Sequence, residues 1–363
     1  MNLAGRIRLR PGMALPTIVS TRPLLAARIA RGRPAGELPA VLGSLFSMCA
    51  HAQRGTARRA VAAAAGEPAL SSSAERAALQ AATAREHALR IAQDWHRLLP
   101  GAPAATPTAA LRGCPLWDAA LAPAEQLRAL PAWLSRHWLG EPVAAWLAAH
   151  AADPAAWAER WCTHIDTSPA RLLRSQRQAL QAIAMPFRPL RLLDQPLLTL
   201  PRLARRMAEE TGFCAEPDWQ GAPAETGPWT RSVDPAPPAP HNAWMRLIAR
   251  LVDLLHLAVP AGCERLAEGA LPLGRHEAVA WTETARGLLV HWVRLEDAPQ
   301  GARVADCRVL APTEWNFHPR GVLARTLASL TGDDRAAQAT RAAAAFDPCV
   351  EFEVESTMEP AHA

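Results

Sequence analysis

Cysteine is the residue type in this chain that is best suited to hold a soft metal, and its spacing limits the possible metal chemistry. The sequence has 363 residues and seven widely separated cysteines, namely Cys49, Cys114, Cys162, Cys214, Cys263, Cys307 and Cys349. None forms a Cys-x-x-Cys pair, and no cysteine–histidine group has the spacing of a zinc finger. Any metal site must therefore combine cysteines from distant parts of the chain.

The two ends of the chain carry the most informative runs of residues. Residues 42–64 read LGSLFSMCAHAQRGTARRAVAAA, residues 281–297 read WTETARGLLVHWVRLED, residues 304–330 read VADCRVLAPTEWNFHPRGVLARTLASL, and residues 342–355 read AAAAFDPCVEFEVE. Together they resemble the nickel–iron hydrogenase large subunits. That family has an R-x-C-G-x-C-x-x-x-H helix near its start, then A-P-R-G and P-T-T-W-N-x-S-P-R segments, and finally D-P-C-x-x-C and a histidine. Order and separations both match.

The resemblance breaks down at the metal ligands. In the family, four thiolates hold nickel and iron, and two of them bridge both metals. Aligned on residues 59–61, Cys49 matches the second cysteine of the first pair, and Cys349 matches the first cysteine of the last pair. The family's other ligand and proton-transfer positions hold Phe46 and Phe352 for two cysteines, Gln53 and Glu355 for two histidines, and Ala4 for an N-terminal acid.

These departures predict a protein that does not activate hydrogen. Two thiolates cannot bridge and terminate a metal pair that needs four, so we do not expect nickel. Loss of the acid also removes a separate requirement for proton transfer. We therefore predict no catalytic residue.

The residues that surround the iron in the family are better preserved. The resemblance implies that Arg286 lies beside the cyanide ligands, that Pro312 and Thr313 line the other cyanide, and that Asp347 lies near the arginine. A guanidinium fork and a hydroxyl are suitable donors to anionic cyanide. The predicted cofactor is accordingly iron with cyanide and carbonyl ligands, held transiently.

Each of these residues also has a structural interpretation. Cys49 taken alone is a small side chain that a helix would bury, whereas the pairing of Cys49 with Cys349 at ligand positions favours a metal role. Because Cys349 matches a nickel-side position, it stays open whether both thiolates bind together, act in succession, or one of them only packs. Arg286 can simply pair with Asp347, and Thr313 can be a hydroxyl at the end of a strand.

The combination of retained and lost residues resembles the hydrogenase expression/formation proteins of the HupK/HoxV family. The resemblance implies an accessory scaffold or chaperone that carries or helps assemble the iron–cyanide–carbonyl unit for the large subunit. Its partners would be hydrogenase maturation proteins and hydrogenase subunits. Two alternatives stay open, a metal-free docking protein for maturation factors and, ranked last, a residual hydrogenase-like enzyme.

Composition predicts a mainly α-helical protein with small antiparallel β elements, an α+β fold like that of the hydrogenase large subunit. Alanine-rich stretches favour helices, and 33 prolines divide them into pieces of ordinary length. We expect a single domain over 1–363, made of N-terminal strands and the Cys49 helix (1–66), a helical body (67–270) with a loop at 213–241, and a C-terminal β meander with a tail (271–363). The predicted strands are 4–10, 16–20, 276–281, 287–295 and 302–310, and the predicted helices are 24–31, 37–66, 75–99, 124–139, 141–151, 154–161, 169–185, 198–212, 242–257, 262–269, 322–330 and 333–345.

Charge and hydropathy exclude other classes of function. The net charge is +5, and because the sequence has no lysine, every basic side chain is an arginine. The arginines alternate with acids, as in Arg85-Glu86, which is typical of a solvated helix face and not of a nucleic-acid interface. No apolar run suits membrane insertion or a signal peptide. We expect a cytoplasmic protein that binds no nucleic acid.

Overall fold

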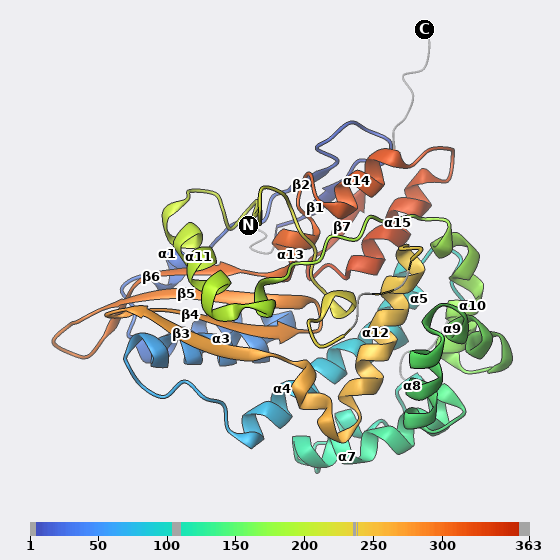
Figure 1. Cartoon of the computed structure of the whole chain (residues 1–363), viewed down its shortest axis with the longest axis horizontal. Helices are drawn as coiled ribbons and strands as arrows, with labels where there is room; N and C mark the ends of the chain where they lie inside the picture. The colour runs from blue at the N-terminus through green and yellow to red at the C-terminus, as the bar shows by residue number, and fades with distance from the viewer. Residues whose placement is uncertain (1–4, 104–109, 235–236, 238, 356–363) are drawn as a thin grey trace, which may run out of the picture.

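The computed structural model describes residues 5–103, 110–234, 237 and 239–355 (Figure 1). The fold is mainly helical with two small sheets, as predicted. Its strands are β1 (Ile7–Leu9), β2 (Ile18–Ser20), β3 (Glu268–Gly274), β4 (Glu277–Thr284), β5 (Gly287–Glu296), β6 (Arg303–Leu310) and β7 (Phe352–Val354). Its α-helices are α1 (Ala26–Ala30), α2 (Leu38–Leu45), α3 (Ala50–Ala64), α4 (Ser73–Leu89), α5 (Trp95–Leu98), α7 (Pro123–Leu134), α8 (Val143–Ala152), α9 (Pro154–His164), α10 (Ser168–Gln181), α11 (Pro196–Glu209), α12 (Ala243–Leu257), α13 (Pro312–Asn316), α14 (Val322–Ser329) and α15 (Arg335–Phe346).

The larger sheet is an antiparallel meander in the order β3-β4-β5-β6. Three of its strands match the predicted runs. The helix predicted over 262–269 is wrong, because a 3-10 turn at Pro260–Arg265 is followed directly by β3. Gly269 and Pro272 made the sequence look unlike a strand, because both residues are rare in sheet interiors. Strand β3 lies at the edge of the sheet, where both are tolerated.

Helices α3 and α11 cover opposite faces of this sheet (Figure 1). The buried positions of α11 recur at helical spacing and pack under the tryptophan-rich face: Leu200, Leu203, Ala204 and Met207. The buried face of α3 consists largely of alanine, which lets the helix approach the other face of the sheet closely. Buried Arg59 ties α3 to β3 through Glu268 at 2.7 Å. This ion pair fastens the second half of α3 to the edge strand of the sheet.

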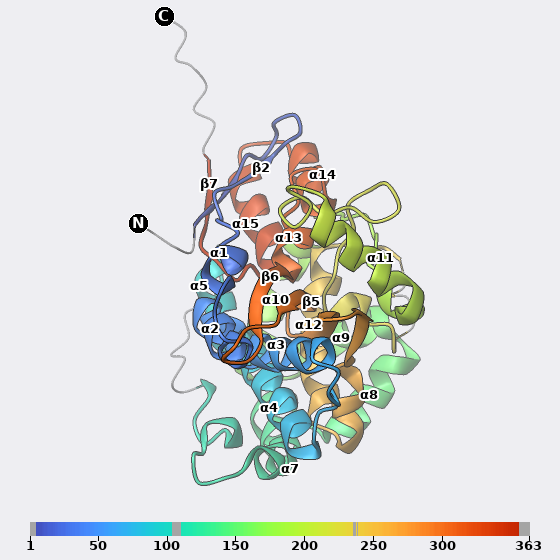
Figure 2. The ribbon, with the colours of Figure 1, turned by 90° about the vertical axis from the view of Figure 1, so that its left-hand side faces the viewer.

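The helical body consists of α4, α7 to α10, α12 and α15, which lie together beyond one end of the meander (Figures 1 and 2). Helix α4 begins with a capping box, in which the Ser72 hydroxyl accepts from the Glu75 N–H and the Glu75 carboxylate accepts from the Ser72 N–H. Helix α12 crosses the body with eleven buried residues. Among the described residues, no helix is both long and apolar enough to cross a membrane.

The smaller sheet brings the two ends of the chain together in the order β2-β1-β7 (Figure 2). Strand β7 pairs with β1 in parallel, and β1 pairs with β2 in antiparallel fashion. The predicted loop at 213–241 is largely irregular where it is described, yet Glu225, Thr226 and Arg231 within it are buried. Pairing of the termini draws the residues before β7 toward the start of α3.

Candidate functional site

Cys49 lies at a break between two helices. The helix predicted over 37–66 is interrupted by a 3-10 turn at Ser47–Cys49, and Cys49 is the residue that caps α3 with non-helical backbone angles. Its side chain is half-buried. The Gln53 amide, one turn into α3, donates to the Cys49 sulfur at 3.7 Å. His51, by contrast, is exposed and takes no part in the site.

Cys349 lies in the irregular segment between α15 and β7. Its sulfur is 2.9 Å from the hydroxyl of Thr313, in the first turn of α13. Pro312 is buried as the first residue of that helix, a position that suits proline because its nitrogen needs no partner there. Thr313 is therefore positioned by a helix start and not by the end of a strand.

Asp347 ends α15 in a left-handed backbone conformation, with φ of 52°. Few residues adopt this conformation readily, and aspartate is among those that tolerate it. The turn aims the carboxylate at three arginines: Arg250 at 3.0 Å, Arg286 at 3.4 Å, and Arg90 in direct contact. Burial raises the pKa of Asp347, but the three guanidinium groups outweigh it and lower the pKa to about 2. Asp347 is a fully ionised anchor for the arginine cluster.

Arg286 occupies the two-residue turn between β4 and β5, whose last pair is Thr284 with Gly287. Its guanidinium is buried and pairs with Glu86 at 2.6 Å through Nη1 and with Asp347 through Nε. Neither of these contacts uses Nη2, the third nitrogen of the Arg286 guanidinium. The interpretation of Arg85-Glu86 as a solvated helix face is wrong, because α4 turns Glu86 toward the hairpin tip and Arg85 donates to the backbone oxygen of Leu116.

A buried chain of hydrogen bonds connects this cluster to the helical body. His87 bridges Asp253 at 2.9 Å and Arg250 at 2.9 Å, and Arg231 from the long loop binds Asp253 at 2.6 Å. Burial lowers the pKa of His87 to about 4, against the opposing effect of its bond to Asp253. The neutral ring can then donate to the carboxylate and accept from Arg250. The side chains around the two cysteines are thereby fixed by packed helices on several sides.

Cys349 and Arg286 both lie close enough to Cys49 to influence its protonation. Burial, together with the nearby charges of Cys349 and Glu86, raises the pKa of Cys49 to about 12, although Arg286 opposes these effects. Burial lowers the pKa of Arg22, but Glu314 at 3.0 Å, together with Cys349 and Cys49, outweighs burial and raises this pKa. The structure therefore brings cysteines from opposite ends of the chain near Arg286.

Where the family has cysteine or histidine ligands, this chain has side chains that pack in the core or form ion pairs. Phe46 and Phe352 both pack against the main core, where an aromatic ring cannot bind a metal. Glu355 pairs with Arg10 at 2.9 Å and Arg8 at 3.4 Å, which fastens the tail to β1. Ala4 lies outside the described residues.

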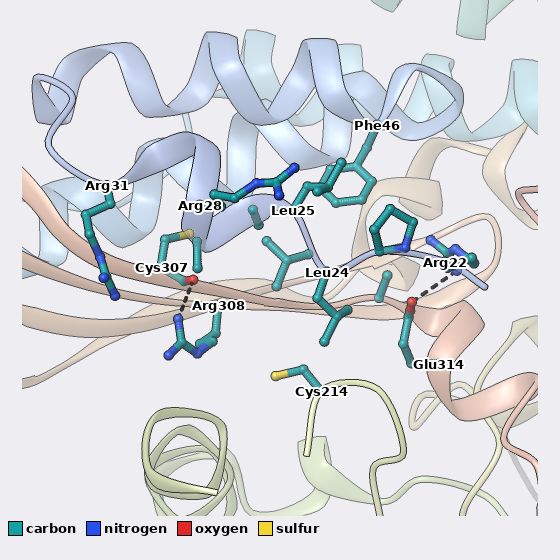
Figure 3. A pocket seen from close by; sticks show the side chains of 15 residues that line it. Arg22, Leu24, Leu25, Arg28, Arg31, Phe46, Cys214, Cys307, Arg308 and Glu314 are labelled. Atoms are coloured by element: carbon teal, nitrogen blue, oxygen red, sulfur yellow. Dashed lines mark hydrogen bonds and ion pairs between the residues drawn. The ribbon is translucent and has the colours of Figure 1, made fainter. Parts of the chain in front are cut away.

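A cavity of about 480 Å³ lies along the edge of the sheet, and the cysteines that line it are Cys214 and Cys307, not Cys49 and Cys349 (Figure 3). Two of its lining residues adjoin the site, since the Phe46 backbone oxygen accepts from the Cys49 N–H and Glu314 follows Thr313. Arg22 and Glu314 face one another as an ion pair. Arg28 and Arg308 line it further along the edge of the sheet. Its surface combines apolar side chains with more arginines than acids, which suits an anionic species.

The donor set restricts which metal species this site can hold. Across the described ranges, no group of three or more histidine, cysteine, aspartate or glutamate side chains is arranged to bind a metal ion. Two thiols alone leave a bare ion under-coordinated. An iron atom that brings its own cyanide and carbonyl ligands needs fewer protein ligands, and the Arg286 guanidinium matches an anionic cyanide. The Thr313 hydroxyl contacts the Cys349 sulfur in this structure.

Curated relatives with known names match nearly the whole chain. The hydrogenase expression/formation protein HoxV of Cupriavidus necator is 41% identical over 97% of this chain and 96% of its own length. The chain belongs to this family. The hydrogenase expression/formation protein HupK of Rhizobium leguminosarum bv. viciae is 34% identical over 93% of the chain and 91% of its own. The HupK protein of Azotobacter vinelandii is 31% identical over 97% and 99%.

Solved structures relate the HoxV/HupK fold to hydrogenases. The Ni-Fe-Se hydrogenase of D. vulgaris Hildenborough aligns with a TM-score of 0.55 at 15% identity, over 92% of both chains. An NAD+-reducing NiFe hydrogenase aligns with a TM-score of 0.52 at 18% identity, over 90% of this chain and 89% of that one. No protein-family model matches the chain. The HoxV/HupK chain therefore has the nickel–iron hydrogenase large-subunit fold.

Sequence reasoning identified the residues from the two ends of the chain but missed those from its middle. The predicted residues all lie around one site: Cys49, Arg286, Pro312, Thr313, Asp347 and Cys349. The missed ones are Glu86, Arg90 and Arg250, which hold Arg286 and Asp347. One signal in the sequence could have indicated them. Each is a charged residue at a helical position where the spacing of the neighbouring apolar residues predicts a buried side chain.

Proposed function

We propose that the chain is a non-catalytic scaffold in nickel–iron hydrogenase maturation that transiently carries the iron–cyanide–carbonyl unit. Relatives named hydrogenase expression/formation proteins support a role in maturation. The observation that supports carriage most strongly is the convergence of Cys49 and Cys349 on one site with Arg286 and Thr313.

Each part of the site has a defined task in this proposal. The two thiols lose their protons and supply soft ligands to the iron. The Arg286 guanidinium, held by Glu86 and Asp347, presents its remaining N–H groups to an anionic cyanide. The cavity that Arg22 and Phe46 line lies on the route that we propose for the approach of an anionic unit. With two thiolates instead of four, the unit is held weakly enough to be passed to the large subunit.

The absence of two thiolates also explains why the chain would not act as a hydrogenase. Phe46 and Phe352 fill the positions that the family uses for the other two cysteines, so a nickel atom would lack its terminal ligands. Hydrogen uptake by the purified chain would contradict this part of the proposal.

Complementation in a host that lacks its own copy distinguishes carriage from metal-free docking. We expect Cys49→Ala and Cys349→Ala variants to abolish or strongly reduce hydrogenase activity in that host, while Cys263→Ala restores it. Cys263 is a matched control, since it is a half-buried cysteine in the 3-10 turn at Pro260–Arg265. Full activity with both cysteine variants, at equal protein levels, would instead support the docking function.

A further inference from the structure

A buried histidine and a buried glutamine form a hydrogen-bonded pair next to Cys49. His291 comes from the face of β5 that packs against α3, and its Nε2 lies 2.7 Å from Oε1 of Gln53. Both side chains have zero exposure to solvent. The Gln53 amide nitrogen points the other way, to the Cys49 sulfur at 3.7 Å. The pair thus connects the centre of the sheet to one thiol of the site.

The surroundings of the ring determine which nitrogen carries its proton. Burial, followed by the nearby charge of Arg59, lowers the pKa of His291 to about 3, so the ring is neutral and has one N–H. Its Nδ1 has no hydrogen-bond partner among the described residues. A proton on Nδ1 would leave a buried N–H donor unpaired, which is rarer and costlier than an unpaired acceptor. The proton therefore belongs on Nε2, where it is donated to Gln53.

This tautomer in turn fixes the orientation of the Gln53 amide. Its oxygen must accept from His291, so its NH₂ group must face Cys49. A hydrogen bond from N–H to a thiolate withdraws charge from the sulfur, which then donates less to a bound metal. Thr313 makes the corresponding contact to Cys349. Each thiol of the site consequently has one hydrogen-bonding partner of its own.

We propose that His291 and Gln53 are positioning residues that hold one N–H on the Cys49 sulfur and thereby set how strongly this thiolate donates to the iron it carries. This inference rests on the proposed function for its effect on iron, but the pair itself exists without metal. The resemblance places a histidine of the hydrogenase large subunits at the position of Gln53, so this chain has an amide where those proteins have an imidazole.

The metal-free full-length chain tests the pair first. In a chain labelled with ¹⁵N-histidine, we expect the His291 resonance to report a neutral ring protonated at Nε2 at pH 7. The resonance is assigned by its absence from a His291→Gln variant. A ring protonated at Nδ1 alone would overturn the inference, because Nε2 would then accept from the Gln53 NH₂ group, which could no longer face Cys49.

Infrared spectra of the loaded chain test the effect on the thiolate. In Gln53→Leu we expect the carbonyl band to move to lower wavenumber, because a stronger thiolate donor increases back-donation from iron to carbon monoxide. His291→Leu should shift the band in the same direction, and His291→Gln, which can still donate to Gln53, should restore it. Two independent variants keep the test valid if one fails to fold.

Gln80→Leu is the matched control. Gln80 is also a buried glutamine, but it donates to the Leu257 oxygen at 2.6 Å, away from the cysteines, so its loss should leave the carbonyl band in place. An unshifted band in Gln53→Leu would overturn the inference. A wild-type chain without any carbonyl band would refute the proposed function instead, and the nitrogen spectra would then decide the pair alone.

Discussion

The Thr313 hydroxyl lies 2.9 Å from the Cys349 sulfur and so links the first turn of α13 to the segment before β7. The contact gives Cys349 a defined orientation although the surrounding backbone is irregular.

Replacing Thr313 tests whether this contact helps to hold the cargo. Thr313→Val keeps the shape of the side chain and removes the hydroxyl, which should weaken retention of iron by about 1 kcal/mol, or roughly fivefold. Thr313→Ser should retain iron like the wild type. Iron per chain after gel filtration is the measurement, and equal retention by the valine variant would contradict a role for the hydroxyl.

Asp347 should contribute more to stability than any other acid of the site. Asp347→Asn leaves Arg90, Arg250 and Arg286 buried around a neutral amide, which should lower the free energy of unfolding by about 3–5 kcal/mol. Asparagine also tolerates the left-handed backbone, so the variant isolates the effect of charge. Urea unfolding measures the loss.

Asp166→Asn is the control for that experiment. Asp166 pairs with Arg171 at 3.1 Å, but its side chain is 73% exposed, so its loss should change the free energy of unfolding by less than about 1 kcal/mol. Equal effects of the two substitutions would show that the buried cluster adds nothing specific to stability.

Acid should destabilise the fold through His87 as the pH falls below about 6.5. The unfolded chain takes up a proton on this histidine near its ordinary pKa of 6.5, whereas the folded chain does so only near 4. The contribution is therefore fully present above pH 6.5 and is lost as the pH falls toward 4, by about 3 kcal/mol in total. Urea midpoints measured from pH 7 to pH 4 should fall across this window. A midpoint that stays constant between pH 6.5 and pH 5 would contradict the neutral, buried ring.

Gly287 should be irreplaceable in the hairpin that presents Arg286. Its φ is +121°, and an added Cβ would collide with the side chain and backbone of Thr226. Gly287→Ala should therefore destabilise the fold by about 2–4 kcal/mol, through backbone strain together with overpacking. Gly274→Ala is the matched control, because a Cβ there meets nothing within 4 Å. Thermal unfolding compares the two variants, and equal midpoints would contradict the need for glycine beside Arg286.

Candidate site residues could be assigned near the two ends of the chain because the order and separation of the sequence motifs there match those of the hydrogenase family. Cys49, Arg286, Thr313 and Cys349 lie in runs whose spacing is fixed by a helix start, a hairpin and a short helix. The middle of the chain offers no such constraint. Whether an arginine on α4 or α12 faces solvent or a buried carboxylate depends on tertiary packing, which helical periodicity alone does not specify.

The same limit explains the errors in secondary structure. Strand β3 was hidden by Gly269 and Pro272, because only its position at the edge of the sheet makes these residues acceptable. Glu86 was predicted to be a surface residue because it follows an arginine. Its ion pair with Arg286, 200 positions away, cannot be predicted from the neighbouring sequence. The Gln53–His291 pair likewise joins residues 238 positions apart.

Infrared spectroscopy of the chain purified from a host with an active maturation pathway tests the central claim most directly. We predict cyanide and carbonyl bands in the wild type and in Cys263→Ala, and their loss in Cys49→Ala combined with Cys349→Ala. Wild-type protein without such bands, or bands that persist unchanged in the double variant, would contradict carriage of the iron unit by these two cysteines.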